Sequence, residues 1–222
     1  MRKFAKPFVS VLALAACMTG PLTSRTFAED RLDTLDPHAH HHHHVMPETT
    51  RRMADYIVPQ VRLVREDGKT VSLPDELNDG RPVVLSFIYT TCTTICPVVS
   101  QTLSQLQRKL GADRDRVHLV SISIDPEEDT PARLAAYARK YDAGPEWQHY
   151  TGTISASVAT QRAFDAYRGD KMKHTPVTFL RAAPEKPWVR IDGFATADDL
   201  MGEIRDMLPP GESHNVLVRA VP

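Results

Sequence analysis

The chain has 222 residues, of which 41% are hydrophobic and 25% are charged, and its formal net charge is -1. This composition is that of a soluble globular protein with room for one domain and its tails. The near-neutral charge, without a basic stripe interleaved with aromatic residues, excludes any case for nucleic-acid binding. The three cysteines, Cys17, Cys92 and Cys96, are too few for a disulfide scaffold, so each needs its own explanation.

Residues 1–28 are typical of an export signal. A few basic residues precede a short apolar run over residues 8–16. This run is shorter than the ~20 residues that a helix needs to span a bilayer. Two cleavage sites compete: a lipoprotein box at Cys17, which would then carry a lipid anchor, and a small-x-small site before Glu29. Both predict a protein of the bacterial periplasm or of the outer face of the inner membrane, which is an oxidising compartment.

Residues 29–53 are predicted to form a flexible tether that is rich in histidine, with His38 and the run from His40 to His44. One hypothesis is a metal-gathering tail, because imidazole binds copper, zinc and nickel. The alternatives are a neutral polar linker and a purification tag. If the run were deleted and the metal stoichiometry did not change, the first hypothesis would be refuted. Residues 210–222 are predicted to form a C-terminal tail.

Residues 54–209 are predicted to form one α/β domain. Asp67-Gly68 indicates the turn of an N-terminal β-hairpin. Thr130 and Thr196 are typical helix N-caps. The predicted strands cover residues 61–65, 70–73, 82–89, 117–124, 147–151, 177–181 and 189–194, and the predicted helices cover residues 98–110, 131–141, 154–167 and 197–208. Because strands alternate with helices, we expect a central sheet with helices on both faces.

Cys92 and Cys96 stand between the apolar strand 82–89 and the helix 98–110. At a helix N-terminus, unpaired backbone N–H groups and the helix dipole lower the pKa of a thiol, and the thiolate both binds soft metals and attacks disulfides. Three residues separate the cysteines, so on a helical path both sulfurs share one face. This wider spacing favours a metal modestly, and a disulfide between Cys92 and Cys96 remains compatible with it.

His174 is the candidate for a third metal ligand, because it precedes the strand 177–181 at the edge where the fold would bring it to the cysteines. Two thiolates and one imidazole suit Cu(I), tolerate Cu(II) and accept Zn(II). The alternative for His174 is an ordinary surface histidine. Asp125 and Asp129 follow the strand 117–124; we favour a turn at Asp125-Pro126 and a contribution of Asp129 to capping the next helix, over a ligand-orienting role for Asp125.

The order of the elements, with the dithiol and His174-Thr-Pro176, resembles thioredoxin. In that fold a cis-proline faces the dithiol, although the sequence leaves the isomer of Pro176 open. The segments Tyr89-Thr-Thr-Cys-Thr-Thr-Ile-Cys-Pro97 and Val120-Ser-Ile-Ser-Ile-Asp-Pro-Glu-Glu-Asp-Thr-Pro131, together with His174, resemble the SCO/SenC family over residues 55–209. Pro176 and the histidine-rich tether depart from what we expect of that family.

The resemblance implies a thioredoxin-like central mixed sheet and one copper ion bound by Cys92, Cys96 and His174. It further implies tethering to the membrane, and delivery of copper to the dinuclear CuA site of cytochrome c oxidase subunit II, or reduction of the cysteines of that site. Another copper-site apoprotein, or a periplasmic copper donor, would be a partner of the same kind.

Two hypotheses of different classes follow. The leading one is a copper metallochaperone that acts outside the cytoplasm. The other is a thiol-disulfide oxidoreductase in which Cys92 attacks a partner disulfide and Cys96 resolves the mixed disulfide. A peroxidase is a weaker third hypothesis, because paired cysteines replace the single active cysteine. The sequence therefore leaves enzymatic activity open.

Overall fold

The computed structural model describes residues 49–208, which form an eight-stranded sheet in the order β1-β8-β7-β4-β5-β6-β2-β3. Strands β4, β5 and β6 are parallel to one another, and every other neighbouring pair is antiparallel. The strands are β1 (Thr50–Ala54), β2 (Arg62–Arg65), β3 (Thr70–Ser72), β4 (Val83–Ile88), β5 (His118–Ser123), β6 (Trp147–Gly152), β7 (Val177–Arg181) and β8 (Trp188–Asp192). The sheet is therefore mixed, as predicted.

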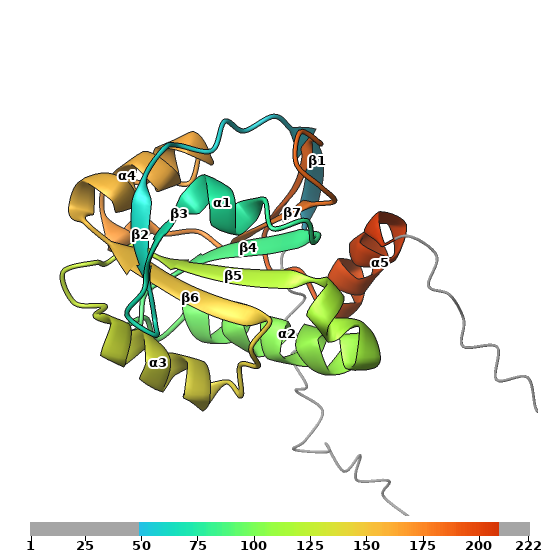
Figure 1. Ribbon diagram of the computed structural model, residues 1–222, viewed down its shortest axis with the longest axis horizontal. Coiled ribbons are helices and arrows are strands. Elements are labelled where there is room, and N and C mark those ends of the chain that lie inside the picture. The colour runs from blue at the N-terminus through green and yellow to red at the C-terminus, as the bar shows by residue number, and fades with distance from the viewer. Residues whose placement is uncertain (1–48, 209–222) are drawn as a thin grey trace, which may run out of the picture. The chain divides into compact units, whose positions relative to one another are not determined.

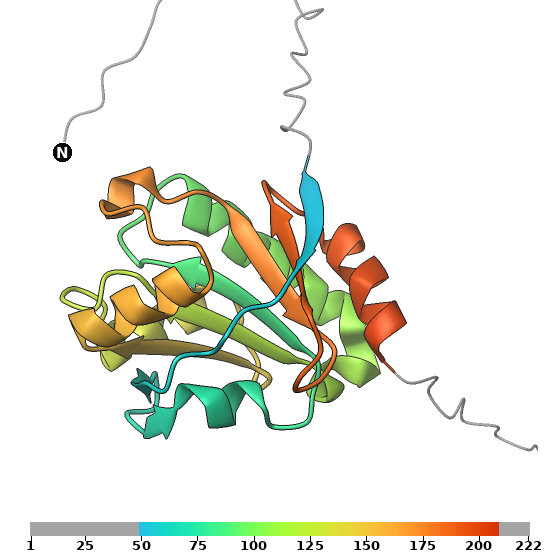
Figure 2. The same cartoon turned by 90° about the horizontal axis from the view of Figure 1, so that it is seen from above.

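Helices cover both faces of this sheet (Figures 1 and 2). Helices α2, α3 and α5 pack on one face, and α1 and α4 pack on the other. The helices are α1 (Leu73–Leu77), α2 (Ile95–Leu110), α3 (Pro131–Lys140), α4 (Ile154–Ala163) and α5 (Ala197–Met207), with short 3-10 turns η1 (Gly111–Arg116) and η2 (Lys171–Lys173).

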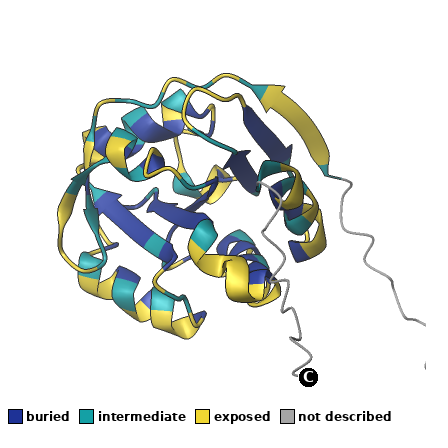
Figure 3. Ribbon diagram, turned by 45° about the vertical axis from the view of Figure 1, so that its right-hand side comes forward, coloured by how far each residue is buried: buried dark blue, intermediate teal, exposed yellow. Residues whose placement is uncertain are grey.

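The two central strands, β4 and β5, are buried along their whole length, as Figure 3 shows by the dark strands inside the molecule. Successive residues of a strand point to opposite faces. In β4, Val84 and Ile88 accordingly join the core under α2, whereas Leu85 and Phe87 join the core under α1 and α4. A near-continuous apolar run such as this one is typical of a strand buried on both faces.

Most of the predicted elements are confirmed. Strands β2 and β3 form the predicted antiparallel hairpin, with Gly68 in the left-handed conformation at φ 85°. The side chain of Thr130 caps α3, and Thr196 forms a capping box with Asp199 at the start of α5. Thr153 caps α4 in the same way.

The largest differences from the prediction outside the cysteine segment concern β1, α1 and α4. The sheet starts before residue 54, because Thr50–Ala54 pairs with β8 along five residues; the strand is short and mostly exposed, so its own sequence carries no alternating pattern. The predicted strand 70–73 ends at Ser72, and residues 73–77 form helix α1, which was not predicted; Pro74 lies in its first turn, where a proline is tolerated. Helix α4 ends at Ala163, four residues before the predicted end.

The signal segment 1–28, nearly all of the tether 29–53 and the tail 210–222 lie outside the described residues and stay predictions. Within residues 49–208, we find no helix with the length and hydrophobicity that crossing a bilayer requires.

Candidate metal centre

The two cysteines lie between the end of β4 and the first turn of α2. The chain leaves β4 at Ile88, turns with a hydrogen bond from the Cys92 N–H to the Tyr89 carbonyl (3.1 Å), and enters α2 at Ile95. Helix α2 thus starts three residues earlier than predicted, and Cys96 belongs to its first turn. Pro97 is compatible with this start, because the first N–H groups of a helix have no partner inside it.

Cys92 takes over the capping of this helix. The side chain of Thr94, the N-cap residue, makes no capping hydrogen bond. Instead, the Cys92 sulfur accepts a hydrogen bond from the Cys96 backbone N–H at 3.3 Å. The geometry brings both sulfurs to one place: the two side chains are free thiols, and they are hydrogen-bonded to each other.

The environments of the two thiols are unequal. Burial raises the pKa of Cys92, but hydrogen bonds from the Cys96 backbone and side chain, from Thr94 and from Tyr89 outweigh it, so the pKa of Cys92 falls to about 7. Burial, with the neighbouring Cys92, raises the pKa of Cys96 well above that of an ordinary thiol. Cys92 is 8% exposed and Cys96 is fully buried. Near neutral pH, Cys92 is therefore the more ionised and the more accessible thiol.

Asp129 holds the segment that leads to the cysteines. Its carboxylate is fully buried and accepts hydrogen bonds from the Thr90 backbone N–H (3.2 and 3.1 Å), the Thr90 hydroxyl (2.5 Å) and the Ser123 hydroxyl (2.6 Å). The prediction that Asp129 helps to cap the next helix was wrong, because Thr130 alone supplies the cap of α3. Asp129 instead fixes the loop two residues before Cys92.

Asp125 forms the predicted turn, and it also makes a contact that the sequence did not predict. Its backbone carbonyl accepts hydrogen bonds from the N–H groups of Glu128 and Asp129. Its carboxylate forms an ion pair of 2.5 Å with Lys171, in turn η2. This ion pair connects the end of β5 with the segment that carries His174.

His174 is buried, and the structure does not bring it into a cluster with the cysteines. Burial, outweighing a hydrogen bond to the Phe87 backbone, lowers the pKa of His174 to about 4, so the ring is neutral at pH 7. The side chain lines a pocket of about 450 Å³ between the end of β5, α4 and residues 166–171. Within residues 49–208, no three His, Cys, Asp or Glu side chains converge closely enough to hold a metal ion. The peptide bond before Pro176 is trans, as are all peptide bonds of this range.

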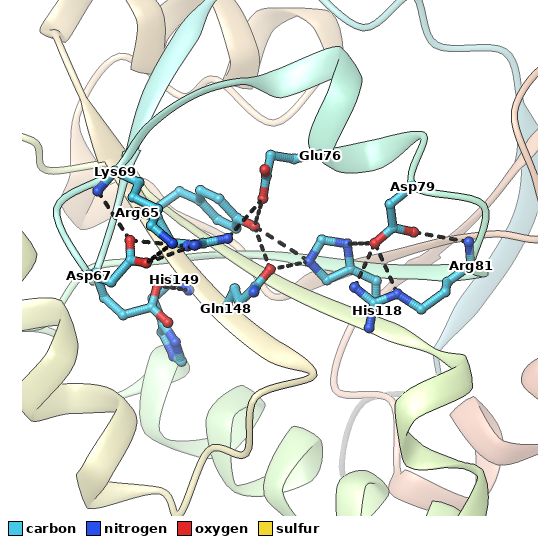
Figure 4. Close-up of polar contacts among 11 residues, drawn as sticks. Arg65, Asp67, Lys69, Glu76, Asp79, Arg81, His118, Gln148 and His149 are labelled. Carbon is cyan, nitrogen blue, oxygen red and sulfur yellow. Dashed lines mark hydrogen bonds and ion pairs between the residues drawn. The ribbon is translucent and has the colours of Figure 1, made fainter.

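The other described histidines belong to the packing of the sheet. Figure 4 shows His118 in a polar chain across β5 and β6, with Nδ1 at 3.2 Å from Asp79 and Nε2 at 2.8 Å from Gln148. The ring of His149 lies between Trp147 and Tyr137, with centroid distances of 5.1 and 6.0 Å. The contacts of both histidines are with residues of the sheet and its packing, and neither set includes Cys92 or Cys96.

The sequence did not predict that residues of turn η2 lie close to Tyr89, next to the thiols. The hydroxyl of Tyr89 donates a hydrogen bond to Met172 Sδ at 3.7 Å, and Lys171 Nζ lies 5.8 Å from the centre of the Tyr89 ring. Met172 is 73% exposed. Its position two residues before His174 was the only signal in the sequence, and a lone methionine is a weak one.

Comparison with known proteins agrees with this fold. The SCO1/SenC family model matches residues 49–209. The SCO1 protein homolog of Bacillus subtilis (strain 168) is 37% identical over 105 residues, which are 47% of this chain and 53% of the relative, so the chain spans about half the length of that curated relative.

Two solved structures support the same assignment. ScoI of Bradyrhizobium japonicum with copper bound is 25% identical, with a TM-score of 0.59 over 68% of this chain and 99% of that one. BsSco is a member of the Sco family of cytochrome c oxidase assembly proteins with a disulfide switch. It is 28% identical, with a TM-score of 0.60 over 71% of this chain and 96% of that one. The predicted thioredoxin-like fold is thereby confirmed, and with nearly three quarters of its length matched by the family model, the chain belongs to the SCO1/SenC family.

Proposed function

We propose that this protein binds copper through Cys92 and Cys96 and passes it to a copper-site apoprotein. The observation that carries the proposal is the pair of free, hydrogen-bonded thiols at the N-terminus of α2. Thiolates are soft ligands that select Cu(I) among the common metal ions. The copper-bound structure of a family member that is 25% identical supports the same cargo.

The two thiols have different roles in binding and releasing the ion. Cys92, with a pKa of about 7, supplies a thiolate near neutral pH, whereas Cys96 releases its proton when the metal binds. The exposed Thr93 and Thr94 leave Cys92 on the side from which a partner ligand approaches. Transfer then proceeds by exchange of ligands, with Cys92 released first and the buried Cys96 last.

His174 is the proposed third ligand. Its neutral imidazole has the free lone pair that a metal requires. Its hydrogen bond with the Phe87 backbone, at the end of β4, uses one ring nitrogen and leaves the other available to a metal. Because no three ligand side chains converge within residues 49–208, the proposal includes a movement of the segment between η2 and β7 when copper binds.

Copper stoichiometry of the reduced full chain tests this proposal. We expect one Cu(I) per domain in the wild type, loss of binding in Cys92→Ala and Cys96→Ala, and weaker binding in His174→Ala. His118→Gln is the matched control, because His118 is equally buried but contacts Asp79 and Gln148 instead of the site. Unchanged copper binding in both Cys92→Ala and His174→Ala would refute the proposal.

The proposed place of action is outside the cytoplasm, and the proposed acceptor is the CuA site of cytochrome c oxidase subunit II. Support comes from the signal-like residues 1–28 and from BsSco, which belongs to a family of oxidase assembly proteins. The test is to mix two equivalents of the Cu(I)-loaded protein with one of the soluble, reduced apo-domain of subunit II, to separate the two proteins and to measure the copper on each. If copper stays on the donor, this acceptor is excluded.

A second function, reduction of disulfides, is favoured by the difference between the two thiols. The Cys92 thiolate would attack a partner disulfide and form a mixed disulfide, and Cys96 would then attack Cys92 Sγ. This releases the partner as a dithiol and leaves a Cys92–Cys96 disulfide, so two electrons pass to the partner. A mixed disulfide trapped by Cys96→Ala supports this function, and its absence with every CuA-type partner rejects it.

A further inference from the structure

Met172 presents its thioether at the surface beside the dithiol. It lies in η2, and its side chain is 73% exposed, the second most exposed large apolar side chain in residues 49–208. Exposing an apolar side chain carries a cost, about 25 cal/mol for each Å² left in water. Single exposed apolar side chains are common on protein surfaces, so the interest of Met172 lies in what its sulfur contacts.

Tyr89 contacts the side chains of Met172, Cys92 and Cys96. Its hydroxyl lies 3.7 Å from Met172 Sδ and can give its one proton to that sulfur or to the Cys92 side chain, and its backbone is hydrogen-bonded to the Cys96 side chain. Met172 Sδ and Cys92 Sγ thus both touch one phenol oxygen, although 80 residues separate them in the chain. The thioether is unbranched and flexible, so it is the part of this arrangement that can move toward the cysteine sulfurs.

The turn that carries Met172 is held in place on both sides. The Met172 backbone N–H donates to the Asp170 side chain at 2.9 Å, and the neighbouring Lys171 is bound by Asp125 at 2.5 Å. The backbone is therefore fixed, while the unbranched side chain keeps three rotatable bonds. This is the combination that a ligand needs if it must reach an ion without rearranging the fold.

We propose that Met172 Sδ is a thioether ligand that completes a three-sulfur Cu(I) site with Cys92 and Cys96. The inference rests on the proposed function and adds a ligand to it. Thiolate and thioether sulfur select Cu(I), whereas imidazole also suits Cu(II). In the arrangement described, His174 is turned to the Phe87 backbone and Met172 is the third soft donor at the pair. Met172 accordingly adds a soft donor that favours Cu(I), beside His174, whose imidazole also suits Cu(II).

X-ray absorption at the copper edge tests this inference directly. The full chain is labelled with selenomethionine and loaded with one Cu(I), and copper–selenium scattering reports a bond from copper to a methionine. We expect this scattering in the wild type and its loss in Met172→Leu. Met53→Leu is the matched control, since Met53 is also exposed, at 52%, but lies on the edge strand β1.

Affinity provides a second measurement. Competition with a chromophoric Cu(I) chelator should show that Met172→Leu binds Cu(I) roughly tenfold more weakly, the scale expected when one supporting group at a metal site is lost. Cu(II) retention should fall in His174→Ala and stay unchanged in Met172→Leu. Absence of copper–selenium scattering in the wild type overturns the inference, whatever the affinities. If the wild type takes up no Cu(I) at all, the proposed function itself fails.

Discussion

Replacement of Asp129 by alanine tests how firmly the dithiol loop is anchored. Asp129 is fully buried, and its carboxylate accepts hydrogen bonds from three donors: the backbone N–H and hydroxyl of Thr90 and the hydroxyl of Ser123. Hydrogen bonds to a charged group contribute about 1.5–3 kcal/mol each, and a buried donor left without an acceptor costs a similar amount.

The three contributions do not simply add, because the two hydroxyls can turn toward other acceptors, whereas the Thr90 N–H cannot. We therefore expect Asp129→Ala to lower the free energy of unfolding by about 3–5 kcal/mol. That is a large part of the ~5–15 kcal/mol by which a typical domain is stable. Because Thr90 stands two residues before Cys92, the loss also loosens the thiol that caps α2.

Urea unfolding followed by circular dichroism gives the free energy of unfolding. The rate at which Cys92 is alkylated in the native state reports how firmly the loop before it is held. Asp199→Ala is the matched control, because Asp199 also accepts from a threonine N–H and hydroxyl, both from Thr196 at 2.8 Å, but at the exposed start of α5. Its expected cost is about 1 kcal/mol. If both variants lost the same small amount, the burial argument for Asp129 would be refuted.

Three further outcomes follow. In the reduced, metal-free protein, Cys92 should react with iodoacetamide with a midpoint near pH 7 and ahead of Cys96; equal rates by peptide mass spectrometry would contradict the assigned environments. Burial lowers the pKa of His149 to about 3, below its unfolded value of about 6.5, so its stabilising effect is complete above pH 6.5 and is lost as the pH falls toward 3. His149→Phe should flatten that part of the stability–pH profile, and an unchanged slope in urea titrations would count against it. Ser121→Ala leaves Trp147 Nε1 without its 2.9 Å acceptor and should cost about 1–3 kcal/mol, measured by the same titration.

The elements whose signals are local could be predicted from the sequence. The apolar runs of β4 and β5 and the caps at Thr130 and Thr196 lie within a few residues of what they specify. Strand β1 could not be predicted, because its evidence is the pairing with β8, whose residues lie about 140 positions later in the chain. The sequence placed the start of α2 after Pro97, although a proline in the first turn of a helix lacks only an N–H that has no partner there.

The candidate site could likewise be predicted from the sequence only in part. Cys92 and Cys96 were identified by their spacing and their place between a strand and a helix, and the structure brings their sulfurs together. The role of Asp129 was missed, because the sequence shows a carboxylate next to a helix start and not the Thr90 backbone on which it acts. The contact of Met172 with Tyr89 depends on how η2 lies over the end of β4, which only the folded chain determines.

The order in which these parts come together during folding follows from the same distances along the chain. Contacts between residues far apart in sequence form slowly, because a long loop must first close. The dithiol and the first turn of α2 involve a segment of five residues, whereas the segment that carries Met172 and His174 takes its place only after β7 has paired with β4. A partly folded chain therefore already carries both thiols but lacks the second segment of the site, so a metal ion captured early would be held by two sulfurs in a chain that is still exposed to aggregation.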